Sequence, residues 1–334
     1  MEPASPPHGL ALVTGATGFV GAVLVRQLLA DGVPVRILRR AESPMDLLGD
    51  AAARVEHATG DVTDPASVRA AAEGADVVYH AAAFVGFGGR RDTARLHAVN
   101  VEGTAHVANA ALAAGVRRLV HTSSIAALGR PATPRLAPID EAAAWAPSRV
   151  NTAYAASKHA AEMEVQRAIA EGLDAVIVNP AVVFGPGRPG EGTFAIAEKV
   201  AAGRMPAAPS GGTCVVDVED VAAGMRAAAA RGATGERYIL GAENRTWMDL
   251  LTTLARALGV RPPRTTVPLP LALALAAASE AAAALTRRRA LLTRETARTS
   301  GHFYRYSGAR AARELGLAYR PFEETAARIA AALR

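Results

Sequence analysis

Residues 10–21 read LALVTGATGFVG, a short apolar run followed at once by a glycine-rich turn. Beyond the turn, apolar residues recur at helical spacing from Val20 to Ala30, and Val33 to Leu38 has the pattern of a second strand. Glycines between a strand and a helix permit a tight turn, close approach of the backbone to a pyrophosphate and close helix packing. The segment therefore predicts a β-α-β unit that binds a dinucleotide, with an ordinary glycine-rich turn as the alternative. The residues expected at the nucleotide are Gly15, Thr17, Gly18, Phe19 and Val20.

The alternation of strands and helices continues along the first half of the chain. Further strands are expected near Arg54 to Glu56 and at Asp76–His80, Arg118–His121 and Ala175–Val178. Between them we expect helices at Pro65–Glu73, at Asn100–Ala114 and around Tyr154 and Lys158. Strands that alternate with helices favour a parallel sheet covered on both faces. The sequence thus predicts an α/β protein with a doubly wound parallel sheet, the Rossmann fold.

The regular alternation ends near Pro180. Glycine- and proline-rich connections follow, including Gly185 to Gly190. We expect a dinucleotide-binding domain over residues 9–180 and a smaller mixed α/β domain, mainly for substrate binding, over residues 181–334. In the second part, one helix is expected after the segment Asp217-Val218-Glu219-Asp220, and another where Thr246 precedes Asp249 as in a capping box.

Composition narrows the class of protein. Half of the 334 residues are hydrophobic, the formal net charge is +6, and aromatic residues make up only 4%. Because the arginines are scattered among alanines, the sequence disfavours nucleic acid as a partner and favours a small phosphate-bearing ligand. Cys214 is the only cysteine, which excludes an internal disulfide and a multi-cysteine metal site. We predict no metal site and a cytoplasmic location.

The longest apolar run extends from Leu271 to Leu285 and is interrupted by Ser279 and Glu280. It is shorter than the ~20 residues that a membrane-spanning helix needs. We expect a helix of the second domain without stable membrane insertion. Contact with a membrane surface is the alternative.

Lys158 is one of only two lysines in the chain, and it follows Tyr154 by four residues. On a helix the two side chains share one face. A compact ammonium can contact both a hydroxyl and a phenolic oxygen, and it lowers the pKa of a tyrosine toward the working pH of a general acid or base. The pair predicts acid/base chemistry, whereas a surface tyrosine beside a solvated lysine is the alternative.

Two features bear on the nucleotide that is bound. Arg39 and Arg40 end the second predicted strand, where an acidic residue would bind a ribose 2′-hydroxyl and an arginine accommodates a 2′-phosphate. We therefore favour NADP(H), with NAD(H) possible and a chance surface pair of arginines as the alternative. Asp61 and Val62 follow the third predicted strand and are expected at the adenine end, although Asp61 could instead cap a turn.

Five motifs occur in order along the chain. They are T-G-A-T-G-F-x-G at 14–21, H-x-A-A at 80–83, N-V-x-G-T at 100–104, S-S-x-x-x-x-G at 123–129, and a variant of R-P-x-x-V-Y-G-P at 179–186. In the last motif Asn179 replaces arginine and Phe184 replaces tyrosine. With these motifs and the tyrosine–lysine pair, the chain resembles an extended short-chain dehydrogenase/reductase of the NAD-dependent epimerase/dehydratase family over nearly its whole length.

The resemblance implies roles for particular residues. Tyr154 is the general acid/base, Lys158 lowers its pKa and binds the nicotinamide ribose, and Ser124 holds the substrate oxygen. Ser123 is the second choice for that serine, and turn-capping hydroxyls are the alternative for both. The resemblance further implies a homodimer and additional cofactor contacts at Ala82, Ala83 and Val183.

The reaction implied is hydride transfer between nicotinamide and a secondary alcohol or ketone. Dehydratases of the family resemble the chain less, because they carry T-D-E where this chain has Thr122-Ser123-Ser124. The second half is more similar to dihydroflavonol reductases, hydroxysteroid dehydrogenases and hopanoid-associated sugar epimerases. The alternatives are an NAD-dependent nucleotide-sugar epimerase and a non-catalytic dinucleotide-sensing protein. Four aromatic residues fall in segments that are expected to border the active site, which suits a small apolar substrate: Phe84, Phe87, Trp145 and Phe184. Core packing is the alternative role for each of them.

Overall fold

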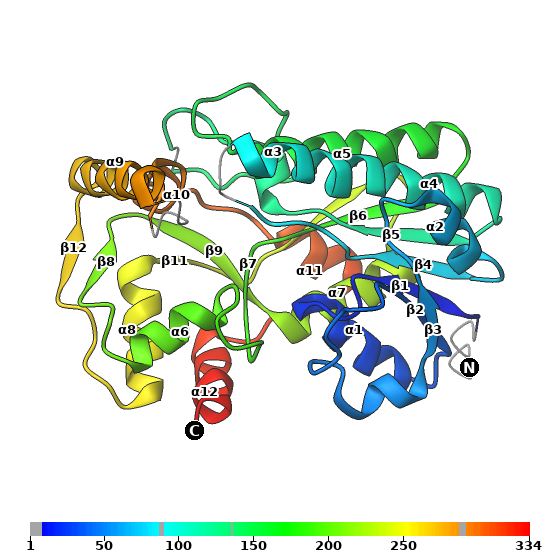
Figure 1. Cartoon of the computed structure of the whole chain (residues 1–334), viewed down its shortest axis with the longest axis horizontal. Helices are drawn as coiled ribbons and strands as arrows, with labels where there is room; N and C mark the ends of the chain where they lie inside the picture. Colours follow the sequence, from blue (N-terminus) through cyan, green and yellow to red (C-terminus); the bar gives the residue numbers. More distant parts are fainter. Residues whose placement is uncertain (1–8, 87–89, 135, 287–291) are drawn as a thin grey trace.

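Seven parallel strands form the largest sheet of the computed structural model, which describes residues 9–86, 90–134, 136–286 and 292–334. The strands follow the order β10-β6-β5-β4-β1-β2-β3 across the sheet (Figure 1). The chain order reverses between β1 and β4, the kind of position at which doubly wound sheets bind dinucleotides. The predicted α/β class and parallel sheet are confirmed. The strand bounds are β1 Ala11–Thr14, β2 Val35–Arg39, β3 Glu56–Thr59, β4 Val77–His80, β5 Arg118–Thr122, β6 Ala175–Pro180 and β10 Arg237–Leu240.

Helices cover both faces of this sheet (Figure 1). On one face lie α2 (Pro65–Ala72), α4 (Gly103–Ala113) and α5 (Ala153–Ala170); on the other lie α1 (Phe19–Ala30), α7 (Val218–Arg231) and α11 (Ala309–Leu315). Successive strand residues therefore enter different cores, as Leu12 and Val13 do. This explains why β6 is buried along its whole length and why its first four residues, Ala175–Val178, form a continuous apolar run rather than an alternating one.

The third strand starts later than predicted, and the large sheet includes a strand from beyond the boundary expected at residue 180. Arg54 ends a 3₁₀ helix, η1 (Gly49–Arg54), so that the third strand starts only at Glu56. β10 lies beyond residue 180 in the sequence but pairs in parallel with β6 at the edge of the large sheet. The division into residues 9–180 and 181–334 stays a prediction. Although β10 and α7 come from the second half of the chain, they pack with the large sheet that the first half forms.

The second half also builds smaller sheets. β7 (Val182–Phe184), β9 (Gly212–Asp217) and β11 (Glu243–Thr246) form a three-stranded sheet, and β8 (Ala207–Pro209) pairs with β12 (Thr265–Val267). Phe184 is fully buried there, with its ring edge-on to Phe322 at a centroid distance of 5.1 Å. It is a core residue, so the expectation that Phe184 borders the active site is wrong. Helices α6 (Phe194–Ala201), α8 (Trp247–Leu258) and α12 (Phe322–Ala332) enclose the same core.

Both helices predicted in the second half are present; α8 starts as expected, whereas α7 starts at Val218, inside the segment that was expected to precede it. The Asp217 carboxylate accepts a hydrogen bond from the Glu219 N–H at 2.8 Å and caps α7. The Thr246 hydroxyl accepts one from the Asp249 N–H at 3.1 Å and caps α8. Each cap satisfies an N–H group that has no partner within its helix.

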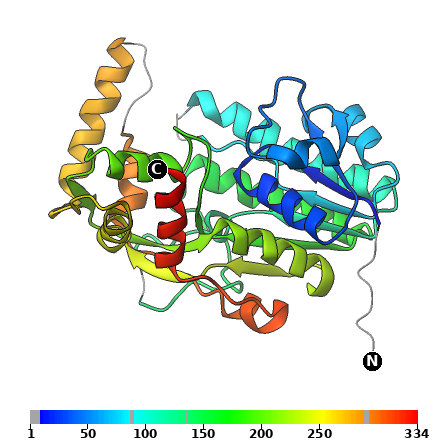
Figure 2. The ribbon, with the colours of Figure 1, turned by 90° about the horizontal axis from the view of Figure 1, so that it is seen from below.

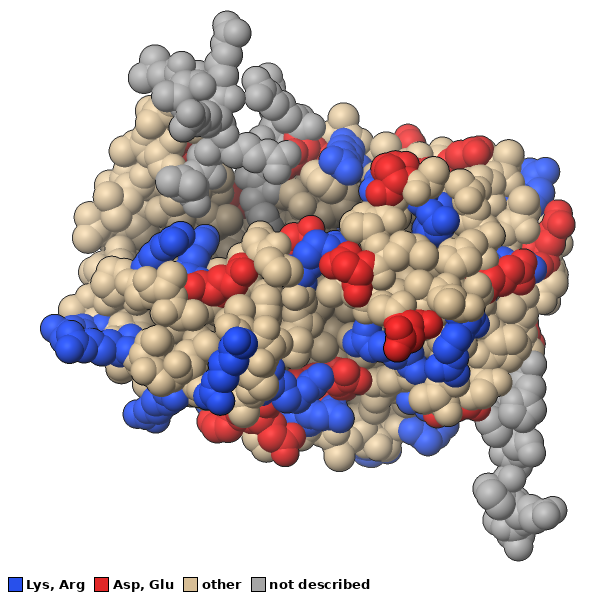
Figure 3. Space-filling view, turned by 60° about the horizontal axis from the view of Figure 1, so that its bottom comes forward, with Lys and Arg blue, Asp and Glu red and all other residues tan. Residues whose placement is uncertain are grey.

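Helix α9 (Leu269–Thr286) extends from the body of the molecule and packs against α10 (Arg294–Gly301) (Figure 2). None of the described helices is long and apolar enough to cross a membrane. Within the described residues, no three His, Cys, Asp or Glu side chains gather as a metal site would require. On the face shown in Figure 3, acidic and basic side chains are interspersed, and no continuous basic stripe crosses it.

Candidate active site

The turn between β1 and α1 depends on its glycines. Gly15 has a φ of 71°, and a Cβ there would lie 2.5 Å from the Ala82 backbone nitrogen. A Cβ at Gly21 would lie 2.2 Å from the Gly15 carbonyl oxygen. Gly18 precedes α1 without a side-chain cap, and the first turn of that helix carries no acidic residue. The first N–H groups of α1 are thus left for a phosphate, and this cradle fits a dinucleotide.

A buried hydrogen-bonded chain connects this turn to β4 and α4. The Thr14 hydroxyl lies 2.7 Å from His80 Nδ1, and His80 Nε2 lies 3.0 Å from the Thr104 hydroxyl. Because Thr104 donates to the Asn100 carbonyl oxygen at 2.6 Å, it accepts from Nε2–H, and Nδ1 accepts from Thr14. Burial, assisted by the charge of Lys158, lowers the pKa of His80 to about 3 and keeps the ring neutral.

Asn100 continues the chain to the helix that carries Tyr154. It lies in a π-helical turn, η2 (His97–Glu102), and its side chain bonds the Phe84 backbone in both directions, at 2.7 and 2.9 Å. Its amide also donates to the Ser157 hydroxyl at 3.0 Å, and Ser157 donates to the Tyr154 carbonyl oxygen at 2.8 Å. The motif at 100–104 contains Asn100. The sequence did not show that Asn100 positions the helix of Tyr154, because that role depends on contacts that form only in the folded chain.

Ser124 and Tyr154 are brought together at the carboxyl end of β5. Ser124 caps a short 3₁₀ helix, η3 (Ile125–Leu128), and Tyr154 lies in the first turn of α5, which Thr152 caps. A hydrogen bond between the Ser124 and Tyr154 side chains favours the phenolate, but burial has the larger effect and raises the pKa of Tyr154. By contrast, the Ser123 hydroxyl is buried and has no hydrogen-bond partner among the residues that the structure describes.

Lys158 is 1% exposed, and its ammonium donates to the Thr122 carbonyl oxygen at 2.8 Å. Burial lowers the pKa of Lys158 to about 8, although the charge of Glu162 acts in the opposite direction. The net shift of the Tyr154 pKa is upward, because burial outweighs the hydrogen bond with Ser124; that Lys158 lowers this pKa stays a prediction. The amine is bound to the end of β5, and burial decides the pKa of the phenol.

Glu162 lies one helical turn beyond Lys158 and is also 1% exposed. It accepts a hydrogen bond from the Asn179 amide at 2.6 Å and pairs with Arg237 of β10 at 3.5 Å. Asn179 also donates to the Ser124 carbonyl oxygen at 3.0 Å. The family motif has arginine at the position of Asn179. In this chain the guanidinium that pairs with Glu162 belongs to Arg237 of β10. Sequence reasoning missed both Glu162 and Arg237 because they are distant in the chain.

The two arginines at the end of β2 have different partners. Arg39 bonds to the His57 ring at 3.1 Å and to two nearby carbonyl oxygens, and it makes no ion pair with a described carboxylate. Arg40 is half-exposed and pairs with Glu42 at 3.2 Å. Asp61 accepts from the N–H and hydroxyl of Thr63, both at 2.9 Å, which is the turn-capping role foreseen as its alternative.

The remaining residues expected at the cofactor lie close to these elements. Ala82 follows β4, and its N–H donates to Thr14 Oγ1 at 3.3 Å; Ala83, next to it, is exposed. Val183 belongs to β7, where its carbonyl oxygen accepts from Thr193 at 2.7 Å. Val62 is buried and lies within 3.0 Å of the position of a Cβ at Gly103.

The other aromatic residues expected near the substrate have separate surroundings. The Trp145 ring stacks on His159 of α5, with centroids 4.5 Å apart and planes 4° apart. The Arg95 guanidinium lies 4.2 Å from the centroid of the Phe84 ring. Phe87 is outside the described residues.

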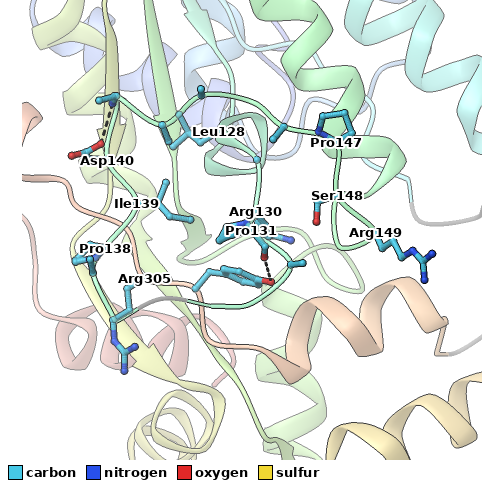
Figure 4. A pocket seen from close by; sticks show the side chains of 18 residues that line it. Leu128, Arg130, Pro131, Pro138, Ile139, Asp140, Pro147, Ser148, Arg149 and Arg305 are labelled. Carbon is cyan, nitrogen blue, oxygen red and sulfur yellow. Dashed lines mark hydrogen bonds between the residues drawn. The ribbon is translucent and has the colours of Figure 1, made fainter.

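A cavity of about 740 Å³ begins where η3 ends (Figure 4). Tyr304 donates to the Pro131 carbonyl oxygen at 2.9 Å along its wall. Ser124, Tyr154 and Lys158 do not line it, so this cavity lies beside the Ser124–Tyr154 pair rather than over it. Its lining includes Leu128, Gly129, Ile139, Arg130, Arg149 and Arg305.

A dinucleotide turn at the switch point of a parallel sheet, facing a serine and tyrosine backed by a buried ammonium, is suited to hydride and proton transfer at a carbon–oxygen bond. This arrangement is that of a short-chain dehydrogenase/reductase of the extended type. Residues 11–241 match the model of the NAD dependent epimerase/dehydratase family, and the chain belongs to that family. It is an oxidoreductase that acts on CH–OH groups.

The similarity to individual proteins extends over most of the chain. A Synechocystis sp. protein provisionally named a dihydroflavonol 4-reductase is 36% identical over 311 residues, covering 91% of this chain and 89% of that protein. Sterol demethylase protein B of Methylococcus capsulatus is 40% identical over 263 residues, 77% of each chain. Among solved structures, that of gox2253 is 35% identical with a TM-score of 0.82 and covers 98% of both chains.

Proposed function

We propose that the protein is an NADP(H)-dependent reductase or dehydrogenase that interconverts a secondary alcohol and a ketone on a small apolar substrate. The observation that carries this proposal is the contact of Ser124 with Tyr154 one helical turn from the buried ammonium of Lys158. The same buried hydrogen-bonded chain links this pair to the nucleotide turn through Asn100 and His80.

Each side chain has a step that suits its environment. A bound nicotinamide dinucleotide supplies or accepts the hydride. Tyr154 donates a proton to the substrate oxygen during reduction and removes it during oxidation, while the Ser124 hydroxyl holds the same oxygen. Because burial raises the pKa of Tyr154, the phenol is protonated at neutral pH and ready to donate. The ammonium of Lys158 then stabilises the phenolate that remains.

The preference for NADP(H) rests on Arg39. Its guanidinium donates to His57 Nδ1 and to carbonyl oxygens, and no described carboxylate neutralises its charge. An arginine that ends the second strand attracts a 2′-phosphate. The name of the Methylococcus relative, a sterol demethylase protein, supports an apolar substrate. A homodimer and a cytoplasmic location, consistent with the free buried thiol of Cys214, belong to the same proposal.

The cofactor proposal is tested by nucleotide binding to the purified full chain. We expect NADPH to bind about tenfold or more tightly than NADH, and Arg39→Asp to reverse this order because it replaces attraction to the 2′-phosphate by repulsion. Arg69→Asp, the same charge change at an exposed site on α2, is the matched control and should change neither affinity. Equal affinities would refute the preference. NAD that stays bound through purification would instead favour the nucleotide-sugar epimerase.

A further inference from the structure

Helix α9 presents an apolar face to the outside of the molecule. Its exposed residues Leu271, Ala274, Leu275 and Ala278 recur at spacings of three and four and so lie on one face. Leu271 and Leu275 are each 52% exposed. A helix on a water-facing surface normally carries polar or charged residues at such positions.

The polar residues of α9 whose side chains are described, Ser279 and Glu280, lie on its inward side. The Ser279 hydroxyl accepts a hydrogen bond from the Leu292 N–H at 3.2 Å. Glu280 accepts from the Arg294 N–H at 2.8 Å and pairs with the Arg294 side chain at 2.7 Å. The inner face also carries the buried Ala276, so α9 is apolar on both faces, and its outer face lacks the polar residues that a water-facing surface normally has, which indicates an apolar occupant outside the helix.

The charge around α9 identifies the kind of occupant. Residues 261–305 contain eight arginines and two glutamates, a net charge of +6 that equals the formal net charge of the whole chain. Among the described members, Arg261, Arg264, Arg294 and Arg298 are exposed. Arg294 is paired with Glu280, which leaves the other three without a described carboxylate that is shown to neutralise them. An apolar helix face in an arginine-rich segment complements a bilayer with anionic headgroups, which attracts each nearby arginine by about 1 kcal/mol.

We propose that α9 lies in the interface of an anionic lipid bilayer, with Leu271 and Leu275 inserted among the acyl chains and the exposed arginines of the same segment other than Arg294 drawn toward the headgroups. The protein rests on the membrane without crossing it, since α9 is not apolar enough to span. Insertion of the outer face leaves the contacts of Ser279 and Glu280 intact, because those contacts lie on the inner face.

The position of α10 connects this surface with the active site. Glu295 of α10 accepts a hydrogen bond at 3.2 Å from the N–H of Ala153, the residue before Tyr154. A membrane-bound α9 thus holds the start of the catalytic helix near the bilayer, where an apolar substrate dissolves. This consequence rests on the proposed function, whereas the membrane contact itself does not.

The test is co-sedimentation of the full chain with vesicles, which needs no substrate. We expect the protein to pellet with vesicles of phosphatidylcholine and phosphatidylglycerol, and about tenfold less with phosphatidylcholine alone or in high salt. Leu275→Glu should weaken binding to the anionic vesicles about tenfold or more, because it removes an inserted side chain and adds a repelled charge. Leu136→Glu, the same change at a leucine that is 88% exposed elsewhere, should bind as the wild type does.

Thermal unfolding of each variant establishes that it is folded before its binding is compared. Failure of the wild type to pellet with anionic vesicles would overturn the proposal, as would undiminished binding by Leu275→Glu. Light scattering without lipid examines the other occupant, a second copy of the chain. A wild-type dimer that Leu275→Glu converts to a monomer, with no vesicle binding by either protein, would show that α9 is a subunit interface.

Discussion

Glu162→Gln removes one buried negative charge beside Lys158 and leaves most of its surroundings in place. The glutamine retains an amide oxygen to accept the hydrogen bond from Asn179, which Glu162 accepts at 2.6 Å. The charge of Glu162 raises the pKa of Lys158 against the effect of burial, and the balance is about 8. Loss of the carboxylate must therefore lower the pKa of Lys158 further.

The size of this change follows from the helix geometry. Side chains four residues apart lie ~6 Å apart, and two unit charges at that separation interact by about 2.8 kcal/mol at an effective dielectric constant of about 20. Since 1.36 kcal/mol corresponds to one pH unit, this sets an upper value of about 2 pH units. We expect a shift of about 1 to 2 pH units, because Arg237 on the other side of Glu162 compensates part of its charge.

The assay is the pH dependence of kcat/KM, which reports groups of the free enzyme. The wild type should lose activity as the pH rises through about 8, where Lys158 loses its proton, while Tyr154, whose pKa is raised, titrates at higher pH. In Glu162→Gln the same decline should occur about 1 to 2 pH units lower. Glu164→Gln, on the same helix but paired with Arg167 at 3.0 Å, should leave the profile unchanged. An unmoved or upward-shifted decline would refute the role assigned to Glu162.

Two further predictions compare neighbouring or matched residues. Ser124→Ala should lower kcat about 10²-fold or more by removing a hydrogen bond at the reacting oxygen, and Ser123→Ala should have little effect, as steady-state rates will show; the reverse result would make Ser123 the catalytic serine. Gly15→Ala should lower the free energy of unfolding by about 2 kcal/mol or more and weaken NADPH binding, because the added Cβ strains a left-handed residue and meets backbone at 2.5 Å. Gly32→Ala, also at positive φ but with nothing within 4 Å, should cost only about 1 kcal/mol in chemical denaturation. Equal losses at the two glycines would remove the argument from the tight turn.

Local pattern was enough to predict the first six strands of the large sheet and the glycine turn. These elements are consecutive in the chain, and each is marked by an apolar run and a turn signal. β10 could not be assigned in the same way, because its place beside β6 depends on a pairing between residues 60 positions apart, such as Val178 and Tyr238. The core position of Phe184 could not be predicted either, because the ring that packs against it, Phe322, belongs to the last helix of the chain.

The site residues divide in the same manner. Tyr154, Lys158 and Ser124 were found from spacing and resemblance, and the structure brings Ser124 to Tyr154. The pKa of Tyr154 was not predictable, because it is decided by burial, which the sequence does not specify. The supporting contacts of Asn100, Glu162 and Arg237 likewise depend on elements that meet only in the folded chain.

The central claim, hydride transfer with Tyr154 as the proton donor, is tested most directly by Tyr154→Phe. The measurement is the consumption of NADPH by wild type and variant with a panel of apolar ketones, together with the NADPH dissociation constant of each protein. We predict that turnover falls about 10²- to 10⁴-fold while the dissociation constant stays unchanged, because the phenol moves a proton but does not hold the nucleotide. A variant that reduces the ketone as fast as the wild type does would contradict the account.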